Sequence, residues 1–141
     1  MNPLGYDDVL LRLGAAVIVG ALIGIDREVR NKPAGLRTMA LVALGSAVFV
    51  MTAIHDTSVE GASRAIQGVV TGVGFLGAGS IIRGRANERV RGLTTAASIW
   101  LASAIGIACG LAFWPLVIAA SGFGMLVLVL EPIDRWLHPN S

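Results

Sequence analysis

Apolar stretches long enough to cross a lipid bilayer dominate this chain of 141 residues. A bilayer-spanning helix needs roughly 20 mostly apolar residues, and five segments of similar length follow one another at about 4–25, 36–54, 66–82, 94–111 and 115–130. Hydrophobic residues make up 55% of the chain and charged residues 14%, which is more apolar surface than a soluble globule of this length can bury. The sequence therefore predicts an all-α, polytopic membrane protein, with residues 1–141 as one transmembrane domain and no nucleic-acid partner.

Basic residues gather in the first and third of the connecting loops, at 26–35 and 83–92. They are Arg27, Arg30 and Lys32 in the first loop, and Arg83, Arg85, Arg89 and Arg91 in the third. The second loop, at 55–65, contains Arg64 as its one basic residue. Because short loops rich in Lys and Arg stay in the cytoplasm, we expect the amino terminus outside and the carboxyl terminus in the cytoplasm.

An ungapped internal match relates residues 20–48 to residues 77–105, with ten identities in 29 positions. The identities include Gly20/Gly77, Gly35/Gly92 and Ser46/Ser103. Each copy contains a helix, a basic loop and a second helix, and the copies start two spans apart. We therefore expect a parallel internal repeat about a pseudo-twofold axis along the membrane normal, a symmetry that is found in transporters and in plain helical scaffolds.

The two loops that this axis brings together differ in charge. Asp26 and Glu28 of the first loop align with Arg83 and Arg85 of the third. Opposite charges attract at short range, so the alignment predicts ion pairs between the loops.

The third apolar segment is rich in glycine and also contains two polar residues, Gln67 and Thr71. Its glycines are Gly68, Gly72, Gly74, Gly77 and Gly79. Small residues let membrane helices approach closely, and polar side chains form hydrogen bonds between helices. This pattern predicts a packing seam; the alternative is a locally broken helix whose carbonyls, with Gln67 and Thr71, line an ion or polar path.

Four motifs follow one another in order along the chain. They are Gly-Ile-Asp-Arg-Glu at 24–28, Pro-Ala-Gly-Leu-Arg-Thr at 33–38, Gly-Phe-Leu-Gly-Ala-Gly at 74–79 and Arg-Gly-Leu-Thr-Thr-Ala-Ala-Ser at 91–98. Together they resemble the MgtC/SapB family of bacterial inner-membrane proteins over most of residues 9–110. The family usually has Glu at the position of Asp26, and its longer members carry a soluble carboxyl-terminal domain, so the chain resembles the short, SapB-like form.

The resemblance implies a multi-pass protein of the bacterial inner membrane with no enzymatic activity. It implies a role in growth at low magnesium, an association with virulence through survival in macrophages, inhibition of the F-type ATP synthase and control by small membrane peptides. We expect no cofactor and no resident metal.

Two groups of polar residues stand at the ends of the predicted spans. Asp26, Arg27 and Glu28 close the first span, where pairing along a helix, a solvated interface or a partner contact each explains them. The second group opens the second and fourth spans and consists of Arg37, Thr38, Arg91, Thr94 and Thr95. Threonine caps helix amino termini and arginine anchors a cytoplasmic face; the alternative is a site for an anion or a lipid headgroup.

Charge is scarce inside the spans. Arg12 lies within the first span, and we expect it to pair with Asp7 or Asp8 and to extend toward the interface. His55, Asp56 and Glu60 lie close together in the second loop, but three ligands in a loop make a poor metal cage. The lone Cys109 excludes an intrachain disulfide.

Two functions remain open on these grounds. The first is a regulatory, non-enzymatic protein that contacts lipids, a second copy (a dimer is favoured) or another membrane protein through its helices and basic loops. The second is a small transporter or channel for magnesium or another cation that uses the Gly-rich third span. No Asp or Glu lies in the middle of any span, and cation pathways normally need such groups, which favours the first function.

Overall fold

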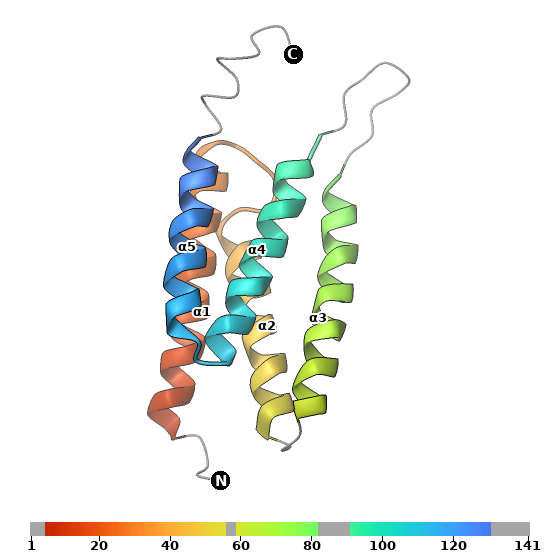
Figure 1. The fold of residues 1–141 in the computed structure, drawn as a ribbon. Helices are drawn as coiled ribbons and strands as arrows, with labels where there is room; N and C mark the ends of the chain where they lie inside the picture. The colour runs from red at the N-terminus through yellow and green to blue at the C-terminus, as the bar shows by residue number, and fades with distance from the viewer. Residues whose placement is uncertain (1–4, 56–58, 82–90, 131–141) are drawn as a thin grey trace, which may run out of the picture.

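Helices account for nearly all of the part of the chain that the computed structural model describes, residues 5–55, 59–81 and 91–130. Within those ranges there are five of them, in the order α1 (Tyr6–Val29), α2 (Leu36–His55), α3 (Val59–Ser80), α4 (Leu93–Gly110) and α5 (Trp114–Val129). Figure 1 shows α1, α3 and α5 running in one direction and α2 and α4 in the other. The prediction of an all-α chain with five helices is confirmed.

Three helices, α1, α2 and α4, are long and apolar enough to cross a membrane, and α5 is a shorter apolar helix of 16 residues. Two helices extend beyond the spans that the sequence predicts. Helix α1 continues to Val29, past the predicted span end near 25, and α3 begins at Val59, before the predicted span start at 66. Both differences have the same cause, because charged residues at a helix end lower the local hydropathy without interrupting the helix; the bounds of the membrane spans stay a prediction.

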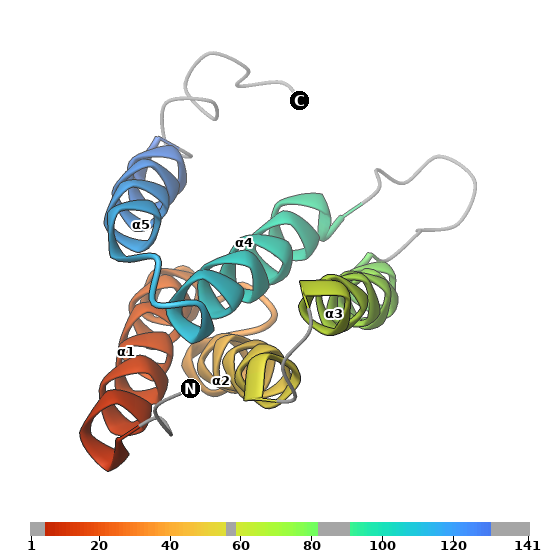
Figure 2. The ribbon, with the colours of Figure 1, turned by 60° about the horizontal axis from the view of Figure 1, so that its bottom comes forward.

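Helices α2 and α4 form the centre of the bundle, with α1 and α3 on opposite sides of them (Figure 2). Both α1 and α3 contact α2 and α4, and within the described ranges they do not contact each other. Helix α5 packs mainly on α4. The buried core therefore follows the α1–α2–α4 contacts, and its fully buried side chains include Ile23, Met39, Ala43, Ala102 and Cys109.

A pair of buried serines joins the two central helices. The Ser46 hydroxyl donates to the Val42 carbonyl at 2.8 Å, and its oxygen lies 2.9 Å from that of Ser103. Because a hydroxyl has one hydrogen, Ser103 is the donor in the second bond. Ser46 and Ser103 are also equivalent positions of the proposed repeat; the duplication itself stays a prediction.

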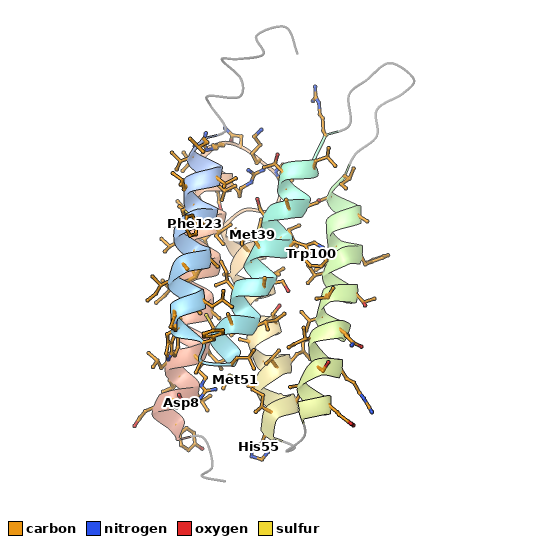
Figure 3. All side chains as sticks on the ribbon, in the orientation of Figure 1. Asp8, Met39, Met51, His55, Trp100 and Phe123 are labelled. Carbon is orange, nitrogen blue, oxygen red and sulfur yellow. The ribbon has the colours of Figure 1, made fainter. Side chains whose placement is uncertain are left out.

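The turn between α4 and α5 is as tight as expected. The Phe113 amide donates to the Ala108 carbonyl at 2.9 Å, Ala112 takes a positive φ of 54°, and Pro115 lies in the first turn of α5. Asp8 and His55 lie at the same end of the bundle as this turn (Figure 3). The start of α2 and the start of α4 lie at the opposite end. Which end faces the cytoplasm stays a prediction.

Candidate functional site

Arg27, in the last turn of α1, is the most deeply buried charge of the described residues. It is 1% exposed, and its Nη2 donates to the Thr95 hydroxyl in the first turn of α4 at 3.0 Å. Thr95 is also 1% exposed. A buried guanidinium needs polar partners, so this contact joins the ends of α1 and α4 and leaves little of Arg27 for an external ligand.

Glu28 is a residue of α1, and its carboxylate lies at the amino terminus of α2. Its Oε2 accepts a hydrogen bond from the Leu36 amide at 3.0 Å, and a Cβ at Gly35 would lie 2.8 Å from that oxygen. Glycine therefore leaves room for the carboxylate at this position. Negative charge is stabilised at a helix amino terminus, so a carboxylate of the chain itself takes a position that the alternative interpretation gave to an external anion.

Asp26 pairs with Arg30 along α1. The Arg30 Nε lies 2.8 Å from Asp26 Oδ1, at a spacing of one helical turn. The expectation of pairing along the helix is confirmed. Because α1 continues to Val29, Asp26, Arg27 and Glu28 belong to a helix end and not to a loop. The predicted partners across the loops, Arg83 and Arg85, lie outside the described residues.

Arg12 holds the opposite end of α4. Its Nη2 lies 2.7 Å from Asp8 Oδ2, the pair that was expected, and its Nη1 donates to the Gly110 carbonyl at 2.8 Å. The second bond was missed, and it puts a cation at the carboxyl end of α4, where helix dipoles favour one. Arg12 and Arg27 are 15 residues apart, as are Thr95 and Gly110, so α1 holds its antiparallel neighbour α4 at both ends.

Four glycines outside the predicted seam bring helix backbones into close contact. On α1, a Cβ at Gly20 would lie 2.6 Å from the Met39 carbonyl oxygen, and one at Gly24 would meet the Leu36 backbone. On α4, a Cβ at Gly106 would meet the Ala43 carbonyl, and one at Gly110 would lie 2.8 Å from that of Ala47. Each pair has the spacing Gly-x-x-x-Gly, the signal in the sequence that could have identified both seams.

The glycines of α3 are placed differently. A Cβ at Gly68, Gly72, Gly74 or Gly79 would meet nothing within 4 Å, and one at Gly77 would meet Ala96 at an ordinary 3.6 Å. Helix α3 is continuous from Val59 to Ser80, so the broken-helix alternative does not fit. Gly77 thus packs on α4, whereas Gly68, Gly72, Gly74 and Gly79 meet no neighbour within the described chain.

An apolar groove of about 760 Å³ lies between α2 and α3. Gly45, Gly68 and Gly72 lie among its lining residues, with the larger side chains of Leu41, Phe49 and Leu76. Thr38 lies at the end of this groove nearest the start of α2. Glycine thus leaves an open groove between α2 and α3. Where α1 and α4 contact α2, by contrast, glycine lets the helix backbones come close together.

The outer face of α3 carries a second open surface, the α3 stripe, defined by Gln67, Thr71, Gly74 and Ala78. Gln67, Thr71 and Ala78 are exposed, and Gly74 is half-buried. The spacing of 4, 3 and 4 residues puts all four on one side of a helix. Thr71 donates to the Gln67 carbonyl at 2.9 Å, so its hydroxyl is satisfied within α3.

A polar groove of about 570 Å³ lies at the start of α2. Its lining includes Glu28, Lys32, Arg37 and Thr38, and Thr38 also lines the apolar groove between α2 and α3. Thr38 therefore borders both grooves. The sequence pointed to Arg37 and Thr38 but gave no signal for the groove that they share.

The start of α4 differs from its prediction. Gly92, at a φ of 93°, is the residue before the helix and no side chain caps it, so Thr94 and Thr95 do not act as caps. Thr95 instead accepts the bond from Arg27, while Arg91 and Thr94 are exposed. The predicted grouping of Arg37 with Arg91 is not among the contacts that the structure describes.

No three His, Cys, Asp or Glu side chains of the described residues lie close enough together to hold a metal ion. His55 and Glu60 are exposed, and Asp56 lies outside the described ranges. Glu60 is 3.7 Å from Arg64, in a pair open to solvent. The candidate functional surfaces are therefore the two grooves and the α3 stripe.

Comparison with known proteins gives matches over most of the chain. The MgtC family matches residues 13–136. The chain is 45% identical to Protein SrpB of Synechococcus elongatus over 129 residues, which cover 83% of this chain and 71% of that protein. It is 47% identical to Protein MgtC of Salmonella typhimurium over 112 residues, or 79% of this chain and 47% of that protein. It is 35% identical to Protein SapB of Bacillus subtilis over 135 residues, or 90% of this chain and 56% of that protein.

The chain thus spans about half the length of the MgtC and SapB relatives. No solved structure matches it.

Proposed function

The chain belongs to the MgtC family, as its motifs predict, and from this membership and the contacts above we propose that it is a non-enzymatic regulatory protein of the bacterial inner membrane. It acts through helix–helix contacts, in the first place with a second copy of itself. The observation that carries the proposal is the α3 stripe, a row of small and polar residues that faces away from the bundle.

The α3 stripe has the chemistry of a membrane interface between helices. Helix α3 lies alongside α2 and α4 over most of their length (Figure 1), so its exposed face shares the depth of two helices able to cross a membrane. A glutamine amide in contact with lipid lacks hydrogen-bond partners. Gln67 gains them when a second α3 approaches, and Gly74 and Ala78 allow the backbones to come close.

The competing function, cation transport, has less support. Several buried polar groups of the described interior already bond to one another, as Arg27 does to Thr95 and Ser46 to Ser103, and the buried Asp26 Oδ2, which has no hydrogen-bond partner, belongs to a carboxylate already paired with Arg30. Helix α3 has no break that would free carbonyls for an ion. An ion path through this bundle would need polar groups that are not already engaged.

Reconstitution in liposomes tests the two functions side by side. We expect the wild-type chain to self-associate, by energy transfer between labelled copies, and to give no magnesium flux. Gln67→Leu weakens self-association about three- to thirty-fold, because interhelical hydrogen bonds are worth about 0.6–2 kcal/mol. Gly122→Leu, at an exposed glycine of α5 with nothing within 4 Å, is the matched control and leaves association unchanged. A magnesium flux abolished by Gln67→Leu would sink the proposal.

We propose the outside-to-cytoplasm topology and the duplication together. The basic residues of the loops at 26–35 and 83–92 support the topology. The placement of α2 and α4 about the Ser46–Ser103 contact, with α1 and α3 on opposite sides, supports the duplication. Cysteines introduced at the exposed positions Asn31 and Glu60 give the test, because the native Cys109 is buried. We expect a membrane-impermeant thiol reagent to label whole cells at position 60 and not at position 31; the reverse pattern would overturn the topology.

The physiological role that the family resemblance implies is growth at low magnesium, with inhibition of the F-type ATP synthase and control by small membrane peptides. We propose this role for the chain, acting through the α3 stripe. Complementation of a deletion strain in low magnesium, with the wild-type chain and Gln67→Leu, tests the role. ATP-driven proton pumping by membrane vesicles, with and without added protein, tests the synthase as the partner.

A further inference from the structure

We propose that the two grooves that meet at Thr38 form one binding site for an anionic phospholipid. The acyl chain lies in the apolar groove between α2 and α3, and the phosphate lies in the polar groove at the start of α2. This site is on the side of α3 that faces α2, and it is separate from the α3 stripe.

The dimensions of the apolar groove fit one leaflet. Its α2 lining runs from Thr38 to Phe49, which is about 16 Å at about 1.5 Å per residue. Half of a hydrocarbon core of about 30 Å is about 15 Å. The lining between these ends is apolar or glycine except for Ser46, and the Ser46 hydroxyl is already bonded to Val42 and Ser103. The groove thus offers an acyl chain space without exposing a polar group to it.

The polar groove has the charge to select the headgroup. Lys32 and Arg37 line it with one carboxylate, Glu28, and with Asn31 and Thr38. The Glu28 carboxylate already accepts the Leu36 amide, so the phosphate is recognised by side chains and not by the first amide of α2. Basic pockets between membrane helices at the cytoplasmic side bind anionic headgroups, and the proposed topology puts this groove at that side.

The residue that both grooves share distinguishes this site from a simple anion site. Thr38 lines both, so a molecule that occupies the two grooves together is charged at one end and apolar at the other. Phosphatidylglycerol and cardiolipin have that chemistry, and inorganic phosphate has only the first part of it.

Native mass spectrometry of the purified full chain tests the site, with phosphatidylglycerol and phosphatidylcholine of the same acyl chains as probes. We expect phosphatidylglycerol to be retained about ten-fold more strongly. The double variant Lys32→Gln/Arg37→Gln lowers this retention roughly five-fold for each charge removed. Gly72→Leu fills the apolar groove, without a clash because nothing lies within 4 Å of a Cβ there, and it lowers retention of both lipids.

Two control variants lie outside the site. Arg64→Gln removes an exposed cation at the other end of α3, and Gly79→Leu enlarges an open glycine that does not line the groove; both keep wild-type retention. Equal retention of the two lipids, or full displacement by inorganic phosphate, would overturn the proposal. So would a Gly72→Leu variant that changes the oligomeric mass with lipid retention unaltered, because the groove is then an interface between copies.

Discussion

Glycine has opposite consequences on the two sides of α2. On the side of α1 and α4, Gly20, Gly24, Gly106 and Gly110 bring backbones into direct contact with α2. On the side of α3, Gly45 of α2 and Gly68 and Gly72 of α3 line an open groove. Helix α3 nevertheless contains more glycines than α1, α2 or α4, so the number of glycines does not measure how tightly a membrane helix packs within its own chain.

The difference follows from what drives association in lipid. Apolar side chains gain little by leaving lipid for protein, and close backbone approach and polar contacts do most of the work. The α1–α2–α4 side has both, because its glycine seams run between the buried Arg27–Thr95 contact at one end and the Arg12–Gly110 contact at the other. On the α3 side, Gly68, Gly72, Gly74 and Gly79 make no such backbone approach within the described chain, and these small residues stay available for lipid or for another helix.

The largest expected difference between the two sides of α2 is the loss of stability in Gly106→Leu compared with Gly72→Leu. A Cβ at position 106 would overlap the Ala43 backbone, whereas a Cβ at position 72 meets nothing within 4 Å and the rest of the leucine extends into an open groove. Overpacking of this kind costs about 3 kcal/mol or more, so we expect Gly106→Leu to lose most of the folded protein. Gly72→Leu leaves the free energy of unfolding, measured by SDS titration in detergent micelles, within about 0.5 kcal/mol of wild type. Equal losses in the two variants would break the comparison.

The second test uses Thr95 and Thr38, which the internal match aligns with each other. Thr95→Val removes the acceptor of a buried guanidinium, and a lost hydrogen bond to a charged group costs about 2 kcal/mol. Thr38 is exposed, so Thr38→Val changes the free energy of unfolding by about 0.5 kcal/mol at most. The same SDS titration measures both; a Thr95→Val variant as stable as wild type would show that Arg27 is held by other groups.

The sequence alone was sufficient for the helices and for some of their polar contacts. Apolar segments identify all five helices because hydropathy and helical length are local properties. The pairs Asp26–Arg30 and Arg12–Asp8 could be predicted for the same reason, since each joins residues one turn apart.

The contacts that hold the helices of the bundle together could not be predicted from local sequence. Arg27 meets Thr95 across 68 positions of sequence, and Arg12 meets Gly110 across 98. Nothing in the local pattern around Arg27 distinguishes an arginine that is buried between helices from one that anchors a loop at the membrane surface. The Gly-x-x-x-Gly spacings in α1 and α4 were present in the sequence, but the denser glycines of α3 gave a stronger signal, and of these Gly68, Gly72, Gly74 and Gly79 meet no neighbour within the described chain.

The central serines provide a smaller test, at the boundary between the two sides. A double-mutant cycle of Ser46→Ala and Ser103→Ala isolates their mutual bond, and we expect a coupling energy of about 0.6 kcal/mol, the average for hydrogen bonds between membrane helices. Ser121→Ala is the control, because Ser121 bonds within α5 to the Val117 carbonyl and should show no coupling to either serine. A coupling near zero would mean that backbone contact alone joins α2 to α4.

The smallest expected effect contrasts Glu28 with Glu60. Glu28 accepts the Leu36 amide at the start of α2, on the tightly packed side, whereas Glu60 lies in the first turn of α3 in an exposed pair with Arg64. Gln at position 28 keeps a hydrogen-bond acceptor and removes the charge, so Glu28→Gln loses the charge–dipole part, about 0.5 kcal/mol. Exposed ion pairs at a separation of one turn contribute little, so Glu60→Gln leaves stability within error.

Salt separates the two readings of the Glu28 result. A charge–dipole contribution is screened by added salt, so the deficit of Glu28→Gln relative to wild type should shrink as ionic strength rises during the SDS titration. A deficit that does not change with salt would mean that Glu28 acts through the hydrogen bond from the Leu36 amide, which a carboxylate accepts more strongly than a neutral amide oxygen does. The lack of a side chain at Gly35 leaves room for that carboxylate, so glycine on the packed side of α2 would serve this contact too, as it does the backbone contacts at Gly24 and Gly106.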